Sequence, residues 1–199
     1  MRHAYRSQID SHRLLGGLKT LDKWLCWRAV EDGDGFRKKP VVLETIDDNQ
    51  PKEAYMRNPD QWMSYTEAKQ TLREHDQLEG LQVVIDVSAD DFVVIDFDDC
   101  VDPETGRIDP TVRQYLRMTD SYAEVSPSGT GIHLILRGNI YNQGWPEQDD
   151  PVEGEIYDKF IVTVTEEHIA GRSYRAQQTD AVLQQYFEDN SVAWRELLF

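Results

Sequence analysis

The sequence predicts an α+β fold with a mainly antiparallel sheet. The middle of the chain, from 80 to 138, contains apolar segments of strand length separated by short turns or by one helical segment. Helical patterns lie before, between and after these segments, in no regular alternation with them. A parallel α/β sheet needs a regular strand–helix–strand order, so the mixed order indicates antiparallel pairing.

Four helices are predicted, each from a local pattern. Residues 7–19 have apolar side chains near one face of an amphipathic helix. A second helix follows Ser64, because Ser64 and Glu67 have the spacing of a capping box. A third covers 110–118, since proline suits its first position. A last helix covers about 179–188.

The predicted strands are short apolar runs rich in valine, isoleucine and aromatic residues. The segment 31–40 is predicted to be a loop that becomes basic at its end. The strands on either side of Ala89 and Asp90 are expected to form a hairpin, because only a short polar turn separates them. The predicted strands are 23–28, 80–88, 91–100, 121–126, 131–138 and 154–165, the last with a bend or without one.

Charge is the most unusual bulk property of the chain. Its 37 acidic and 21 basic residues give a net charge of −16. This balance argues against loose binding of nucleic acid through a broad basic face. It fits either a protein adapted to high salt, where self-repulsion is screened, or an ordinary acidic protein.

Length and cysteine content point to a cytoplasmic domain. The 199 residues fit one large domain or two small lobes with a shared core. There is no run of 18 apolar residues, and the N-terminal residues lack the apolar region of a secretory signal. Cys26 and Cys100 lie in no CxxC pattern, so we expect two buried thiols in a reducing compartment.

The segment "VVIDFDDC" predicts a metal-binding carboxylate pair. Alternation along a strand places Val93, Ile95 and Phe97 toward the core and Asp96 and Asp98 on the opposite face. Two carboxylates on one face repel each other, and a hard cation such as Mg²⁺ or Mn²⁺ between them would stabilise their charged forms. A solvated acidic turn at a strand end is the alternative.

The segment "EVSPSGTGIHLIL" predicts a phosphate site. Gly129 and Gly131 permit a tight turn whose backbone N–H groups can form an anion-binding nest, and Ser128 adds a hydroxyl. His133 falls on the strand face opposite the core, where it can reach a phosphate oxygen. The alternative is a hairpin turn followed by an incidental histidine.

A third carboxylate follows in the next strand segment. If this strand joins the same sheet, Glu155 can complete a cluster with Asp96 and Asp98, as in two-metal phosphoryl transfer. Asp158 is an alternative, although alternation places it on the other face from Glu155.

In order and spacing these motifs resemble the archaeo-eukaryotic primase superfamily. The resemblance is greatest to the primase-polymerase domains of archaeal plasmids and viruses, and it covers roughly residues 20 to 170. "VVIDFDD" matches the acidic first motif, "SPSGTGIHLIL" the Ser-Gly-x-Gly-x-His motif, and "EIYD" before "FIVTVT" the acidic third motif. Where related domains often have threonine-glycine, this chain has Thr165-Glu166, and it has no GxxxxGK[ST] motif.

The resemblance implies a nucleotidyltransferase that copies a single-stranded DNA template in replication of a plasmid, virus or other mobile element. It would have an αβ lobe over about 1–80, an RRM-like lobe over about 81–175 whose open sheet face carries the motifs, and a helical segment over 176–199. A replicative helicase would lie on the same longer chain or on a separate protein.

The resemblance also assigns residue roles. Asp96, Asp98 and Glu155 would hold two Mg²⁺ or Mn²⁺ ions. The triphosphate of the incoming nucleotide would be bound by Ser128, Gly129, Gly131 and His133. Lys39, with Lys38 or Arg37 beside it, would contact phosphate or template, unless this basic run is a solvated loop.

Other functions are consistent with parts of the pattern. A primase-fold module could bind nucleotides or replication origins without catalysis. "VVIDFDD" is also similar to the nucleophilic aspartate strand of haloacid-dehalogenase-like phosphatases, but here it lies in mid-chain and no later acidic motif of that family follows. A HUH-type nicking initiator needs His-x-His, which is absent.

Overall fold

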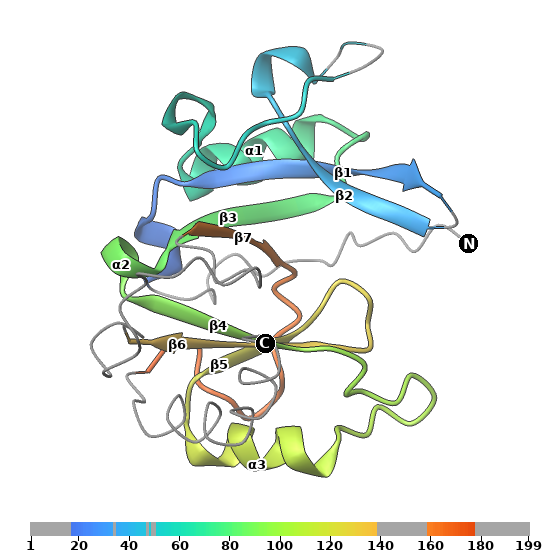
Figure 1. Cartoon of the computed structure of the whole chain (residues 1–199), viewed down its shortest axis with the longest axis vertical. Coiled ribbons are helices and arrows are strands. Elements are labelled where there is room, and N and C mark those ends of the chain that lie inside the picture. The colour runs from blue at the N-terminus through green and yellow to red at the C-terminus, as the bar shows by residue number, and fades with distance from the viewer. Residues whose placement is uncertain (1–16, 34, 47, 49–50, 139–158, 178–199) are drawn as a thin grey trace, which may run out of the picture.

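The strands form two antiparallel sheets in the computed structural model, which describes residues 17–33, 35–46, 48, 51–138 and 159–177 (Figure 1). The larger sheet has the order β2-β1-β3-β7, with β1 Trp24–Asp32, β2 Gly35–Val41, β3 Gly80–Asp86 and β7 Lys159–Val164. The smaller sheet has the order β4-β6-β5, with β4 Phe92–Phe97, β5 Tyr122–Val125 and β6 Ile132–Arg137. The predicted α+β class with antiparallel sheets is confirmed.

Two predicted helices begin at the caps that predict them. Helix α1, Tyr65–Glu74, has a complete capping box between Ser64 and Glu67. Helix α3, Pro110–Met118, begins after Asp109, whose carboxylate accepts from the backbone N–H groups of Thr111 and Val112. The short helix α2 covers Val87–Asp90, and 3₁₀ turns cover Leu18–Thr20, Leu43–Thr45 and Pro59–Gln61. Most of the predicted helix 7–19, and all of that at 179–188, lie outside the described residues.

The predicted loop 31–40 is wrong, because most of it is strand. Cys26 to Asp32 of β1 pair with Gly35 to Val41 of β2 in one continuous antiparallel ladder. Much of this ribbon is exposed, with charged residues along both strands. It therefore lacks the apolar alternation that marks a half-buried strand.

The predicted hairpin around Ala89 and Asp90 is also wrong. Strand β3 pairs with β1 and β7, whereas β4 pairs with β6, so the chain leaves one sheet at α2 and enters the other. The Asp90 carboxylate accepts from the ammonium of Lys23 at 2.6 Å and from the backbone N–H of Asp86 at 2.7 Å. These two contacts hold the turn in a shape that directs β4 away from β3.

The smaller sheet is buried on both faces. Its outer face packs on α3 through the predicted core residues of β4 and β6, among them Val93, Ile95, Leu134 and Leu136, which confirms the predicted alternation. On its inner face, Phe92, Tyr122 and Ile135 join the core of the larger sheet and α1. The face that carries Asp96 and His133 is therefore not open along its length. A third cluster around Leu25, Ala54 and Val84 covers the other face of the larger sheet.

Strand pairing crosses the predicted lobe boundary near residue 80. Strands β3 and β7 lie in the same sheet as β1 and β2, so hydrogen bonds run between the two predicted lobes. The division at residue 80 stays a prediction.

Cys26 and Cys100 are buried and free, and burial raises the pKa of Cys26 to about 12. Within the described ranges, no helix has the length and apolar character needed to cross a bilayer.

A buried ion pair fastens α1 to the turn after β7. The Lys69 ammonium lies 3.0 Å from a carboxylate oxygen of Glu166, and the two side chains are 7% and 6% exposed. The Tyr65 hydroxyl donates to the other oxygen of Glu166 at 2.8 Å. Glu166 has φ +64°, the left-handed region that favours glycine. The contacts of the Glu166 side chain with Lys69 and Tyr65 therefore offset the strain in its backbone.

Lys69→Met is expected to lower the free energy of unfolding by about 3 kcal/mol, because it leaves the Glu166 carboxylate buried without its cation. Denaturant unfolding followed by circular dichroism measures the change. The double variant Lys69→Met with Glu166→Gly removes both charges and the left-handed strain but also the acceptor of the Tyr65 hydroxyl, so part of the lost stability should return. A single variant that unfolds at the wild-type denaturant concentration would contradict this account.

Candidate active site

The acidic pair lies at the end of β4. Asp96 is directly opposite His133 in the β4–β6 register, and its side chain is 56% exposed. Strand β4 ends at Phe97, so Asp98 lies in the turn that follows. The pKa of Asp96 is raised, first by partial burial; His133 acts against this and the nearby charge of Asp98 adds to it. The two carboxylates are therefore close enough to repel each other, as their spacing predicts.

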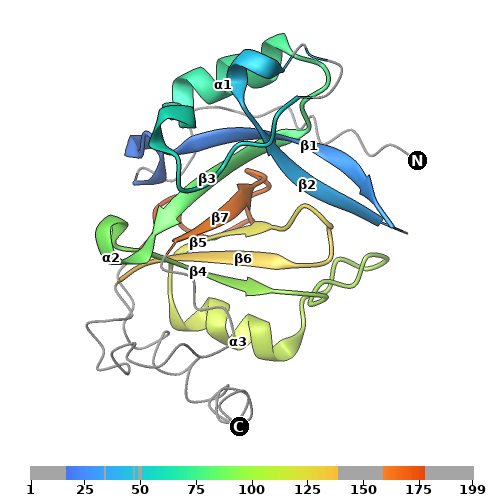
Figure 2. The same cartoon turned by 45° about the horizontal axis from the view of Figure 1, so that its top comes forward.

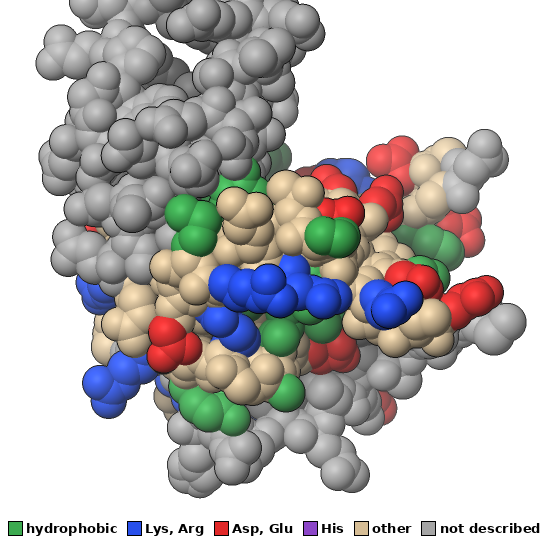
Figure 3. Space-filling model, turned by 90° about the horizontal axis from the view of Figure 1, so that it is seen from below, with side chains coloured by type: hydrophobic (Ala, Val, Ile, Leu, Met, Phe, Trp, Pro, Cys, Tyr) green, Lys and Arg blue, Asp and Glu red, His purple; other side chains and the backbone are tan. Residues whose placement is uncertain are grey.

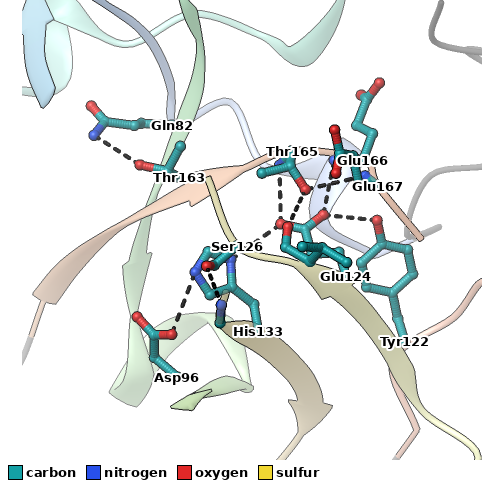
Figure 4. Close-up of polar contacts among 12 residues, drawn as sticks. Gln82, Asp96, Tyr122, Glu124, Ser126, His133, Thr163, Thr165, Glu166 and Glu167 are labelled. Atoms are coloured by element: carbon teal, nitrogen blue, oxygen red, sulfur yellow. Dashed lines mark hydrogen bonds and ion pairs between the residues drawn. The ribbon is translucent and has the colours of Figure 1, made fainter. Parts of the chain in front are cut away.

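His133 lies between two carboxylates (Figure 4). Its side chain is 6% exposed, with Nε2 3.6 Å from Oδ1 of Asp96 and Nδ1 3.2 Å from Oε1 of Glu124. The ring thus connects the half-exposed acidic pair to a polar group in the interior. The structure confirms that His133 lies on the face opposite the α3 core.

Glu124 is the carboxylate behind His133, and it has no exposed surface. Its oxygens accept from the Tyr122 hydroxyl at 2.9 Å and from the backbone N–H groups of Thr165 and Glu166, both at 3.0 Å. Burial and the charge of Glu124 raise the pKa of Tyr122, so its hydroxyl remains a donor. The Glu124 carboxylate accepts all of these hydrogen bonds. We therefore assign a hydrogen to Nδ1 of His133, which then donates to Glu124 as well. Nε2 is then left facing Asp96.

The serine-glycine turn is held by its own hydroxyls. Gly129 has φ +80°, and its N–H donates to the carbonyl of Ser126. The N–H groups of Thr130 and Gly131 donate to the hydroxyls of Ser128 and Ser126. A Cβ on Gly131 would lie 2.9 Å from the carbonyl oxygen of Phe97, so glycine lets the turn approach the end of β4. The backbone N–H groups of 129–131 are thus occupied, and the exposed Ser128 hydroxyl lies 2.9 Å from the hydroxyl of Ser126 and 3.1 Å from that of Thr130.

A hollow of about 210 Å³, which we call the site hollow, opens where the two sheets meet beside these groups. Asp96 and His133 line it from the smaller sheet, and Thr163 lines it from the larger one. In Figure 4, Thr163 and Gln82 lie across from Asp96 and His133. The lining residues are Lys38, Val94, Asp96, His133, Ile161, Val162 and Thr163. The arrangement can bind a charged ligand between one carboxylate, a histidine and a lysine.

The basic residue in the site hollow is Lys38, and the predicted Lys39 lies elsewhere. Lys39 faces the other side of β2, where its ammonium lies 3.8 Å from Glu53, and Arg37 contacts the same carboxylate at 2.8 Å. Desolvation lowers the pKa of Lys38, although the residue as a whole is exposed, while the charges of Asp96 and Asp98 act to raise it. A role of Lys39 in phosphate or template contact stays a prediction. The placement of Lys38 toward the hollow could not be predicted without strand β2 and its alternation.

Glu155 lies outside the described residues, as does the alternative Asp158. Strand β7, which follows them, belongs to the larger sheet rather than to the sheet of Asp96. It nevertheless borders the site hollow through Thr163. In the part of the chain that is described, no group of three or more histidine, cysteine or acidic side chains is placed to hold a metal ion. The assignment of Glu155 as third ligand stays a prediction.

Glu124 was missed in the sequence. It lies in "SYAEVS", where alternation groups it with Tyr122 and places both on the face opposite Ala123. A charged residue in so short an apolar strand, next to the serine-glycine turn, was the available signal. Its role depends on pairing with His133 across the sheet, which the register of β5 and β6 establishes.

Comparison with known proteins supports a relationship with primase-polymerases. No family model matches the sequence. Over 153 residues the chain is 30% identical to a DNA primase-polymerase of Nitratiruptor phage NrS-1. The match includes 75% of this chain but 20% of the relative, so the chain spans about a fifth of the length of that curated protein. The superfamily and the archaeal type stay predictions.

Glu124→Gln is expected to disturb His133, because an amide places donors where the carboxylate only accepts. The hydrogen-bonded Nδ1–H resonance of His133 should shift or broaden in ¹H–¹⁵N spectra, with a stability loss of about 1–3 kcal/mol. Tyr122→Phe removes one donor and does not touch the imidazole, so it is the matched control and should leave that resonance in place. An unchanged resonance in Glu124→Gln would mean that Glu124 does not orient the ring.

Proposed function

We propose that this domain carries out template-directed nucleotidyl transfer as the catalytic part of a DNA primase/polymerase in replication of a virus, plasmid or other mobile element. One observation supports it above the others: Asp96, His133 and Lys38 line a single hollow. They do so in a chain related to a phage primase-polymerase. The template would be single-stranded DNA and the substrates nucleoside triphosphates. A replicative helicase would act on the same longer chain or in trans.

The described acidic residues fit part of a divalent-metal site. The pKa of Asp96 is raised partly by the charge of Asp98, and a cation between the two carboxylates would relieve that repulsion. Asp96 and Asp98 would hold Mg²⁺ or Mn²⁺, with Glu155 as the proposed third ligand. When bound, such ions favour ionisation of the attacking hydroxyl and balance the charge of the triphosphate.

The other residues of the site would bind and orient the nucleotide. His133 would donate from a protonated Nε2 to a phosphate oxygen, while its Nδ1–H donates to Glu124, which fixes the ring from behind. Ser128 would donate its exposed hydroxyl, while Gly129 and Gly131 shape the turn that carries it. Lys38 would add the positive charge, toward phosphate or template, that we had expected from Lys39.

Asp96→Asn is expected to lower nucleotide incorporation at least about 100-fold, because it removes a charge at the reacting centre and preserves side-chain volume. The assay follows labelled nucleotide addition on single-stranded DNA with Mg²⁺ or Mn²⁺, with and without a primer. Asp91→Asn, at the other end of β4, is the matched control, because Asp91 has φ +56° and asparagine tolerates that conformation.

Each result of this assay has a distinct meaning. Loss in Asp96→Asn alone supports catalysis at this site, and the lane without primer tests priming. Equal activity in both variants contradicts the assignment of Asp96. A folded wild-type protein that incorporates nothing contradicts the proposal and favours a module that binds nucleotides or origins without catalysis.

His133→Gln is expected to weaken nucleotide binding about 10-fold and to leave binding of single-stranded DNA nearly unchanged, because the ring faces the site hollow. Titration calorimetry with a non-hydrolysable nucleoside triphosphate measures the first affinity, and fluorescence anisotropy of a labelled oligonucleotide measures the second. Unchanged nucleotide affinity would remove His133 from the phosphate site.

A further inference from the structure

Strands β1 and β2 extend beyond the larger sheet as a two-stranded ribbon (Figure 2). Pairing between β1 and β3 stops at Trp27 and Gly80, whereas pairing between β1 and β2 continues to Asp32 and Gly35. Residues 28–32 and 35–39 therefore have no third strand beside them among the described residues. In Figures 1 and 2 the ribbon extends toward the same side of the molecule as the turn between β5 and β6.

The two faces of this ribbon differ in chemistry. Arg37 and Lys39 share one face, and both contact Glu53. Alternation places Phe36 and Lys38 on the opposite face. Phe36 is 74% exposed, more than any other large hydrophobic residue that the structure describes. Lys38 has no ion pair within 4.0 Å in that part of the chain.

The face with Phe36 and Lys38 is continuous with the site hollow. Lys38 lines the hollow together with Asp96 and His133. Phe36 follows on the same face two residues along the strand, about 7 Å farther out. An exposed aromatic ring beside a lysine is the combination with which proteins bind unpaired bases and their phosphates.

We propose that this face of the ribbon, Phe36 with Lys38, binds a single DNA strand as it leaves the site hollow. A base would stack on Phe36 and the adjoining phosphate would contact Lys38. The inference rests on the proposed function and names where the DNA lies. Phe36 lies outside the site hollow, on the exposed part of the ribbon. A DNA strand that continues beyond the hollow can reach this ring, so we assign Phe36 to the strand rather than to the incoming nucleotide.

Stacking also accounts for how so acidic a protein can bind DNA. A net charge of −16 disfavours a long track of phosphate contacts. Stacking on a neutral ring needs no such track and tolerates any base sequence. With one or two phosphate contacts, the logarithm of the affinity should fall with the logarithm of salt concentration at a slope of only about −1.

A second basic surface provides the electrostatic control. Figure 3, seen from the α3 side, shows Lys and Arg side chains gathered in a band. Arg113 and Arg117 are the exposed arginines of α3. The smaller sheet separates α3 from the site hollow, so this surface does not continue into it. DNA held by charge alone at the α3 surface would depend on these arginines.

The test measures binding of a fluorescein-labelled oligothymidylate by anisotropy, without nucleotide or metal. Phe36→Ala should weaken binding roughly 5- to 100-fold, Phe36→Leu should weaken it similarly, and Phe36→Trp should restore it. Arg113→Ala with Arg117→Ala, and Tyr55→Ala at another exposed aromatic residue, should change it little. An oligonucleotide carrying 2-aminopurine should show quenching that Phe36→Ala removes.

The outcomes separate this inference from the proposed function. Wild-type affinity in Phe36→Ala overturns the inference even if Asp96→Asn abolishes incorporation. A loss of affinity only in the α3 double variant overturns it in favour of the α3 surface. A loss of triphosphate affinity in Phe36→Ala with intact oligonucleotide affinity assigns the ring to the nucleotide and overturns it too. Weaker DNA binding in Phe36→Ala, restored in Phe36→Trp, supports it even if the domain incorporates no nucleotide.

Discussion

Glu124 is a carboxylate without any contact with solvent, and that burial constrains much of the surrounding structure. An isolated buried charge is very costly, so its neighbours must be donors. They come from three places: Tyr122 on its own strand, His133 on β6, and the backbone of Thr165 and Glu166 after β7. The Glu124 side chain thus fixes both the imidazole of His133 in the smaller sheet and the turn that follows β7 of the larger sheet.

The conformation of Glu166 follows from the same constraint. To direct consecutive N–H groups at one carboxylate, the chain turns sharply after Thr165, and Glu166 takes a left-handed conformation. A glycine at this point would make the turn without strain. Here the side chain reaches α1 instead and pairs with Lys69. The site is thereby connected, through contacts in the interior, to a helix on the larger sheet.

Features set by neighbouring residues could be predicted from the sequence, and features set by distant partners could not. The capping box of Ser64 and the proline after Asp109 act within one turn of helix, and both helices begin where predicted. The apolar alternation of β4 and β6 likewise needs only the strand itself. Which sheet β3 joins depends instead on β1 and β7, residues far away in the chain. The same holds for Glu124, whose importance appears only when His133 lies opposite it.

The site hollow lies at a junction, with Lys38 and Thr163 on one sheet and Asp96 and His133 on the other. The distance between the positive and negative groups therefore depends on how closely the sheets dock. A ligand that touches both sides ties the sheets together, and mass action then favours the docked state in proportion to ligand concentration. Occupancy of the site and docking of the two sheets are therefore thermodynamically linked.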